Sequence, residues 1–187
     1  MAQSDGEASL DSADSFKHSL IEVLPQLRAF ARGLCGRRDY ADDLVQETMV
    51  KAWASRGRFE PGTSIRSWTF TILRNHFISE LRRSGKQQAM DPAAAERLLV
   101  APAEQEARVH LSDMDAALQK LAPERREAVV LVGAGGFTYE EAAEICECAI
   151  GTIRSRVARG RAELAQLLAS DHGKAEAGAV SNRDPGP

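Results

Sequence analysis

The 187-residue chain has little of what several protein classes require. Its three cysteines are an odd number and too few for a disulfide scaffold, which indicates a reducing compartment. Its apolar runs fall short of the roughly 18 residues that a membrane span needs. The first fifteen residues are acidic and polar, so they do not form a secretory signal peptide. These shortages exclude membrane and secreted classes, and they predict a cytoplasmic protein without a membrane partner.

Strand patterns are missing as well, because apolar residues recur at helical spacing almost throughout the chain. Pro25 lacks a helical hydrogen-bond donor, so it predicts a kink or a restart in the first helical stretch. Pro123 suits the first turn of a helix. We expect helices over about 16–34, 40–55, 64–83, 111–121, 123–132, 138–146 and 149–168.

A change in composition divides the chain in two. Residues 84–107 contain glycine, two prolines and many alanines, which predicts an interdomain linker with one helical turn at 96–99. The predicted fold class is therefore all-α, with two small helical domains joined by a flexible linker. The predicted boundaries are a disordered N-terminal tail at 1–14, a first domain at 15–86, a linker at 87–110, a second domain at 111–169 and a disordered C-terminal tail at 170–187.

No excess of basic residues marks the chain, since its formal net charge is −3, and this total alone argues against nucleic-acid binding. The charges are segregated, however. Residues 64–86 carry five basic side chains and one acid, residues 150–161 carry four arginines and no acid, and residues 39–47 carry four acids and no base. Basic clusters are typical of phosphate-binding surfaces, although charged residues also simply solvate helix faces.

The strongest local signal is a helix-turn-helix over 138–161. Thr138 and Glu141 form a capping box, a short break follows near Glu147, and a basic helix comes next. At about 100° per residue, the apolar residues of that helix share one side. The other side and its flank present side chains that bind bases and phosphates in a major groove: Thr152, Arg154, Ser155, Arg156 and Arg159.

The expected helix over 64–83 is a second candidate for nucleic-acid binding. Its polar strip includes Thr71, Arg74, Asn75 and Arg82. Aromatic residues beside a basic strip suit single-stranded DNA, whose bases stack on them. Trp68 is placed for this purpose, although core packing explains it equally well.

Sites for catalysis or metals are not recognisable. Cys146 and Cys148 are one residue apart, without a nearby pair of histidines, so the spacing does not predict zinc. No glycine-rich phosphate loop follows a strand, and the four histidines are scattered. The sequence therefore predicts no enzyme, no cofactor, no metal and no small-molecule substrate. It leaves open whether Cys35, Cys146 or Cys148 is redox-active.

Two segments resemble a known family. DDLVQETMVKAW (42–53) followed by SIRSWTFTILRNHFISELRRSGK (64–86) resembles region 2 of extracytoplasmic-function (ECF) sigma factors, and FTYEEAAEICECAIGTIRSRVARGRAEL (137–164) resembles their region 4. The overlapping stretch VGAGGFTYEEAAEICECAIGTIRSRV (132–157) is also similar to the EcfG-like class of the alphaproteobacterial general stress response. The resemblance covers about 15–169. The chain departs from it at Glu147, where the wider family often has glycine.

The resemblance implies roles for the segregated charges. Asp43, Gln46 and Glu47 would bind core RNA polymerase at the β′ clamp helices, and the chain would also contact the β subunit. Region 4 would read the −35 element as duplex through the helix-turn-helix residues given above. An anti-sigma factor resembling NepR would be a further partner. Region 2 would read the melted −10 element through Arg66, Trp68, Thr71, Arg74, Asn75 and Arg82.

Two alternatives stay open. A sigma-like decoy would bind the anti-sigma factor and never touch promoters, although a decoy does not need an arginine-rich helix. A free-standing helix-turn-helix repressor would leave the first domain without a purpose.

Overall fold

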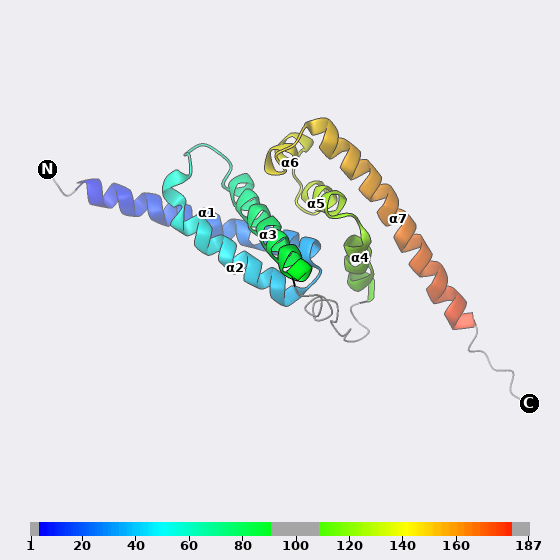
Figure 1. The fold of residues 1–187 in the computed structure, drawn as a ribbon. Helices are drawn as coiled ribbons and strands as arrows, with labels where there is room; N and C mark the ends of the chain where they lie inside the picture. Colours follow the sequence, from blue (N-terminus) through cyan, green and yellow to red (C-terminus); the bar gives the residue numbers. More distant parts are fainter. Residues whose placement is uncertain (1–3, 91–108, 181–187) are drawn as a thin grey trace, which may run out of the picture.

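The computed structural model describes residues 4–90 and 109–180, and every regular element in these ranges is helical (Figure 1). The predicted all-α fold class is therefore confirmed. None of the described helices is both long and apolar enough to cross a bilayer. The elements are α1 (Ser4–Cys35), α2 (Arg38–Ala54), the short 3₁₀ helix η1 (Arg56–Arg58), α3 (Ile65–Met90), α4 (Val109–Lys120), α5 (Pro123–Val132), α6 (Tyr139–Ile145) and α7 (Ile150–Val180).

Helix α1 runs through Pro25 without a restart, so of the two predicted outcomes, a kink or a restart, the restart is wrong. A proline leaves the carbonyl four residues earlier without its helical donor. That residue is Ile21, which is 53% exposed, so water can reach its carbonyl. On the opposite side of α1, residues before and after Pro25 are buried and hold both halves in place: Leu20, Val23, Leu27 and Phe30.

Both termini of the described chain are helical where tails were predicted. Helix α1 begins at Ser4 and α7 continues to Val180, so the segments 4–14 and 170–180 differ from the disordered tails expected there. Extending an existing helix costs little because each added residue closes one hydrogen bond, whereas starting a helix is costly. Acidic residues at the start of α1 also favour its dipole.

The end of α3 lies beyond its predicted limit. The helix continues to Met90, seven residues past the predicted limit at Arg83. The helical turn expected at 96–99 falls outside the described residues. Pro123 occupies the first turn of α5, as predicted.

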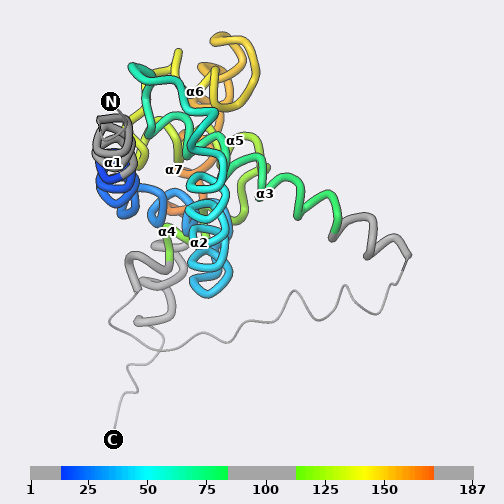
Figure 2. Tube along the Cα trace, turned by 90° about the vertical axis from the view of Figure 1, so that its left-hand side faces the viewer, coloured from blue at the N-terminus to red at the C-terminus, as the bar shows by residue number. Residues whose placement is uncertain are grey.

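The two groups of helices form one packed body. Helices α1–α3 make one bundle and α4–α7 make the other, with α5 packed on α1 and α6 packed on α3 (Figures 1 and 2). Their apolar side chains belong to a single buried cluster. The sequence left open whether the two predicted domains lie together or apart, and here they lie together.

An aromatic stack lies at the centre of this shared core. Phe70 of α3 is fully buried, stacks on Phe30 of α1 at 4.9 Å between ring centroids, and meets Phe137 edge-on at 4.7 Å. Nearby, Gly33 of α1 allows close approach to Val130 of α5, because a Cβ at Gly33 would lie 2.8 Å from a Val130 methyl carbon. The contact between the bundles is thus tight and apolar.

Polar groups complete the contact at the end of α1. Arg126 of α5 donates to the carbonyl of Leu34 at 2.7 Å and to the side chain of Gln119. Gln119 in turn donates to the carbonyl of Gly33 at 3.2 Å. The last carbonyls of a helix lack partners within the helix. The second bundle therefore supplies donors that cap α1.

Candidate nucleic-acid interface

The helix-turn-helix is formed by α6, a tight turn and α7. The capping box is confirmed, because Thr138 Oγ1 accepts from the Glu141 amide at 3.1 Å and the Glu141 carboxylate accepts from the Thr138 amide at 2.8 Å. Ile153 and Val157 are buried and fix the inner side of α7. The local sequence therefore determines both the start of α6 and the rotation of α7 about its axis.

The predicted DNA-reading residues of α7 divide into two groups. Arg154, Ser155 and Arg159 are exposed on the outer side of the helix, and Thr152 is half-buried beside them. Arg156 is half-buried and turns inward, with Nη1 3.9 Å from the Cys148 sulfur. Arg154 also lies 3.7 Å from the Glu140 carboxylate, and both of these side chains are largely exposed. Four of the five predicted residues thus remain on the accessible side of α7.

The turn between α6 and α7 uses a left-handed backbone at Glu147. Its φ is 52°, and it is the one residue other than glycine with a positive φ in the described chain. A non-glycine residue in this region costs about 1–3 kcal/mol. The backbone at Glu147, where the family that the sequence resembles often has glycine, is therefore strained.

Replacing Glu147 by glycine is expected to raise the free energy of unfolding by about 1 kcal/mol. The relieved strain exceeds the roughly 0.5–1 kcal/mol that glycine costs through the entropy of the unfolded chain. Urea denaturation followed by circular dichroism measures the change. Glu144→Gly, on an exposed helical position of α6, is the matched control and should lower stability by about 1 kcal/mol. Equal losses in both variants would contradict the strain at Glu147.

An acidic face lies on α2. Asp43, Gln46 and Glu47 are all exposed, and Val50 beside them is 64% exposed. The buried side of α2 holds them outward through Leu44, Val45 and Thr48. The three predicted polymerase-binding residues are therefore brought together on one accessible surface, with an exposed apolar side chain next to them.

Four aromatic side chains gather at one end of the first bundle. Phe59, in the loop before α3, lies 5.4 Å from Trp68 and 5.6 Å from Phe16 between ring centroids. Phe16 also contacts Trp53 at 6.3 Å. Trp68 and Phe59 are half-buried, whereas Trp53 is 40% exposed. Trp68 therefore packs in the aromatic group and remains partly accessible, and its role in binding bases stays a prediction.

The remaining residues of the predicted −10 surface do not share one exposed strip. Asn75 and Arg82 are exposed, and Thr71 is half-buried with its hydroxyl donating to the Ser67 carbonyl at 2.9 Å. Arg66 lies over Phe137, with its guanidinium carbon 3.9 Å from the ring centroid. Arg66 thus faces the second bundle in this arrangement.

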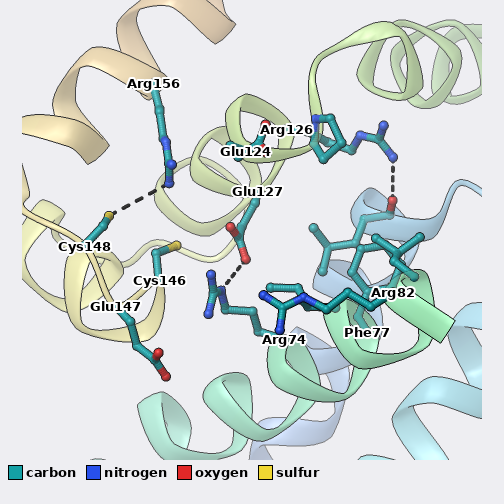
Figure 3. Close-up of a pocket in the computed structure, with 14 residues that line it drawn as sticks. Arg74, Phe77, Arg82, Glu124, Arg126, Glu127, Cys146, Glu147, Cys148 and Arg156 are labelled. Carbon is teal, nitrogen blue, oxygen red and sulfur yellow. Dashed lines mark hydrogen bonds and ion pairs between the residues drawn. The ribbon is translucent and has the colours of Figure 1, made fainter. Parts of the chain in front are cut away.

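Arg74 also faces the second bundle. Its Nε donates to Glu127 Oε1 at 2.6 Å, and the side chains are only 13% and 10% exposed. Figure 3 shows this ion pair between α3 and α5, beside Cys146. Hydrogen bonds between ionised groups are short and strong when water is largely excluded. The pair therefore joins the two bundles directly.

A cavity of about 620 Å³ opens beside this ion pair. Apolar side chains of α3, with Leu34 of α1, line one part of it, and α5 and the turn after α6 line the rest (Figure 3). Charged side chains line it as well: Arg74, Arg82, Glu124, Arg126, Glu127, Glu147 and Arg156. In the described residues, no group of three histidine, cysteine or acidic side chains is close enough to hold a metal ion.

The thiols differ in their surroundings. Cys146 is buried, and burial raises its pKa to about 12, with nearby Glu127 adding to the rise. Burial likewise raises the pKa of Cys35 to about 12, although Arg126 opposes this. Cys148 is half-buried and lines the cavity. Only the thiolate is reactive, so Cys35 and Cys146 are held in an inert form.

Native protein at pH 8 is expected to react with an aromatic disulfide reagent at Cys148 first. Cys35 and Cys146 should react at least about a hundredfold more slowly, because their thiolate fractions are depressed by burial. The same two pKa shifts lower stability above pH 9, since the unfolded chain then releases protons that the native chain retains. Mass spectrometry of quenched samples identifies each labelled thiol. Equal rates for all three would contradict the assigned burial.

Two important residues were not found from the sequence. Glu127 and Phe137 are the partners of Arg74 and Arg66 across the bundle contact. Glu127 carried a usable signal, because it is an acid on the apolar side of α5, and buried acids are normally paired. Phe137 carried no such signal, because neighbouring residues in the sequence do not show what a buried loop phenylalanine contacts.

Comparison with known proteins agrees with this geometry. The family model Sigma-70 region 2 matches residues 20–87, and Sigma-70, region 4 matches residues 111–164. The ECF RNA polymerase sigma factor EcfG of Rhodopseudomonas palustris is 46% identical over 84% of this chain and 87% of that protein. The sigma factor CarQ of Myxococcus xanthus is 33% identical over 83% and 90%.

A solved structure is similar over the same length. It contains the sigma factor RpoE in complex with the anti-sigma factor NepR from Bartonella quintana. The match has a TM-score of 0.75 and 45% identity, and it covers 84% of this chain and 98% of that chain. Both bundles are therefore shared with sigma factors, in the same order. The chain belongs to the sigma-70 family of RNA polymerase sigma factors, and within it to the ECF group.

Proposed function

We propose that this sigma factor binds core RNA polymerase through the exposed face of α2 and reads promoters through α3 and α7. The observation that carries the proposal is the α7 surface, where Arg154, Ser155 and Arg159 are exposed over a buried apolar back. Arginine pairs with guanine in a major groove, and serine binds bases or phosphates. Region 4 thus presents a surface suited to a duplex −35 element.

For the −10 element, the aromatic group at the start of α3 supports recognition of unstacked bases. Asn75 and Arg82 extend a polar, basic strip along the same helix. We assign Thr71 to this strip too, and we assign Arg66 and Arg74 to it on the condition that region 4 moves away from them. The chain then works by binding in the cytoplasm, where RNA polymerase acts, and has no catalytic role of its own.

Regulation by a NepR-like anti-sigma factor, in a general stress response, is the second part of the proposal. It is supported by 45% identity to a sigma factor solved together with NepR, and by 46% identity to EcfG. The cavity between the bundles supplies an apolar wall with charged edges, which suits an amphipathic partner helix.

Run-off transcription tests the proposal. Purified protein added to core polymerase should yield defined transcripts from genomic promoter fragments at a stated salt concentration, and NepR from the same genome should suppress them. Asp43→Lys combined with Glu47→Lys should lose binding to core polymerase, since both acids become bases on an exposed face. Asp14→Lys, an exposed acid on α1, is the matched control and should retain binding. Wild-type protein that neither binds core polymerase nor starts transcripts would overturn the proposal.

A further inference from the structure

The contact between regions 2 and 4 withholds part of the proposed −10 surface. Arg74 and Arg66 belong to the helix that would read melted DNA, yet both are engaged by region 4. Arg74 is bound by Glu127, and Arg66 lies over Phe137. While these contacts last, Arg74 Nε and the side of the Arg66 guanidinium that covers Phe137 are not available to DNA.

We propose that Arg74 and Glu127 form a latch that keeps the free sigma factor closed and holds Arg74 away from nucleic acid. The inference has two parts, the latch that closes the chain and the masking of Arg74 from nucleic acid. The masking half rests on the proposed function of α3, whereas the latch itself does not. Arg74 then has two alternative partners, both of them hydrogen-bond acceptors, and binding one excludes the other. One is the carboxylate of region 4 in the closed chain, and the other is a phosphate or base acceptor in the open chain.

The surroundings of the pair favour a switch over a plain structural contact. Both side chains are largely buried at 2.6 Å, so removing either partner leaves a buried charge unpaired. An unpaired arginine in an interface between two bundles can regain water when the bundles separate, which an arginine inside one core cannot do. Loss of Glu127 should therefore open the chain and leave each bundle folded.

Arg66 strengthens this interpretation. Its Nε is buried and has no hydrogen-bond partner within the described part of the chain. The guanidinium of Arg66 gains a cation–π contact with the ring, but this contact does not satisfy the Nε donor. In the closed chain, Arg66 thus lacks a hydrogen bond at Nε, and opening exposes Arg66 together with Arg74.

Phe137 connects this contact with the shared core. Its ring lies beneath Arg66 and also meets Phe70 edge-on at 4.7 Å. Separation of region 4 would withdraw this ring from both neighbours at once. The latch and the aromatic contact would therefore open together.

The first measurement is small-angle X-ray scattering of the free chain, without polymerase or DNA. Wild-type protein should be compact, and Glu127→Gln should increase the radius of gyration, with the open population rising about tenfold or more. Glu124→Gln, an exposed carboxylate on the same helix, is the matched control and should leave the radius unchanged. Circular dichroism verifies that every variant keeps its helices.

Charge exchange provides a second test that a merely structural role would not pass. Arg74→Glu alone should open the chain, because two acids would then face each other. Arg74→Glu combined with Glu127→Arg should close it again, since the pair is restored in reverse. An unchanged radius in Glu127→Gln, or no closure in the exchanged pair, would overturn the latch.

The masking half is tested by fluorescence anisotropy with a labelled single-stranded −10 oligonucleotide at low, fixed salt. Glu127→Gln should bind it about tenfold more tightly than wild type, and Arg74→Ala placed in the Glu127→Gln background should lose the gain. An open Glu127→Gln chain without tighter binding would overturn the masking and retain the latch. Failure of wild-type protein in run-off transcription is a separate result that concerns the proposed function.

Discussion

Replacing Phe70 by alanine is expected to lower the free energy of unfolding by about 3–5 kcal/mol. The side chain is fully buried and touches two other aromatic rings, Phe30 at 4.9 Å and Phe137 at 4.7 Å. Truncation leaves a cavity beside residues of both bundles, and aromatic pairing adds about 0.5–1.5 kcal/mol beyond buried area. Urea denaturation followed by circular dichroism measures the loss.

Ile21→Ala is the control for this change, because Ile21 is 53% exposed on α1 and its loss should cost less than about 1 kcal/mol. Phe70→Ala should also loosen the contact between the bundles, since the ring is shared by both. Similar losses for the two variants would show that the aromatic stack is not the centre of the core.

Replacing Arg159 by alanine is expected to reduce promoter-specific transcription about 10- to 100-fold, with stability unchanged. Arg159 is exposed on the outer side of α7, so no packing is lost. A bidentate arginine–guanine contact is worth about 1–3 kcal/mol, which corresponds to this range. Run-off transcription measures the rate, and an electrophoretic assay of holoenzyme on duplex −35 DNA measures affinity.

Arg161→Ala is the matched control. Arg161 is an exposed arginine on the same helix, two residues further and thus turned about 200° away. Its loss should change transcription less than about twofold, although it removes the same charge. Equal effects of both substitutions would indicate a diffuse electrostatic contribution from α7 instead of recognition by Arg159.

Structural features that depend on residues close by in the sequence were predictable. The capping box at Thr138, the start of α5 at Pro123 and the outward side of α7 each follow from residues within one or two helical turns. The continuity of α1 through Pro25 could not be predicted, because the effect of a proline depends on whether the freed carbonyl faces water. That depends on the packing of α1, which is a tertiary property.

The placement of the −10 residues could not be derived from the sequence. Arg74 pairs with a residue 53 positions later in the chain, and Arg66 stacks on one 71 positions later. A helical wheel places Arg74 on the polar side of its helix, but it does not show whether the side chain contacts water, DNA or another helix. Only the arrangement of the two bundles decides this.

The aromatic group at the start of α3 has a spectroscopic consequence. The chain contains two tryptophans, Trp53 and Trp68, and both belong to this group. Tryptophan emission therefore arises entirely from one end of region 2, and region 4 contributes none. Quenching or a spectral shift on adding DNA reports on that end alone, without any attached dye. The sigma factor thus carries its own optical probe of base stacking beside the proposed −10 surface.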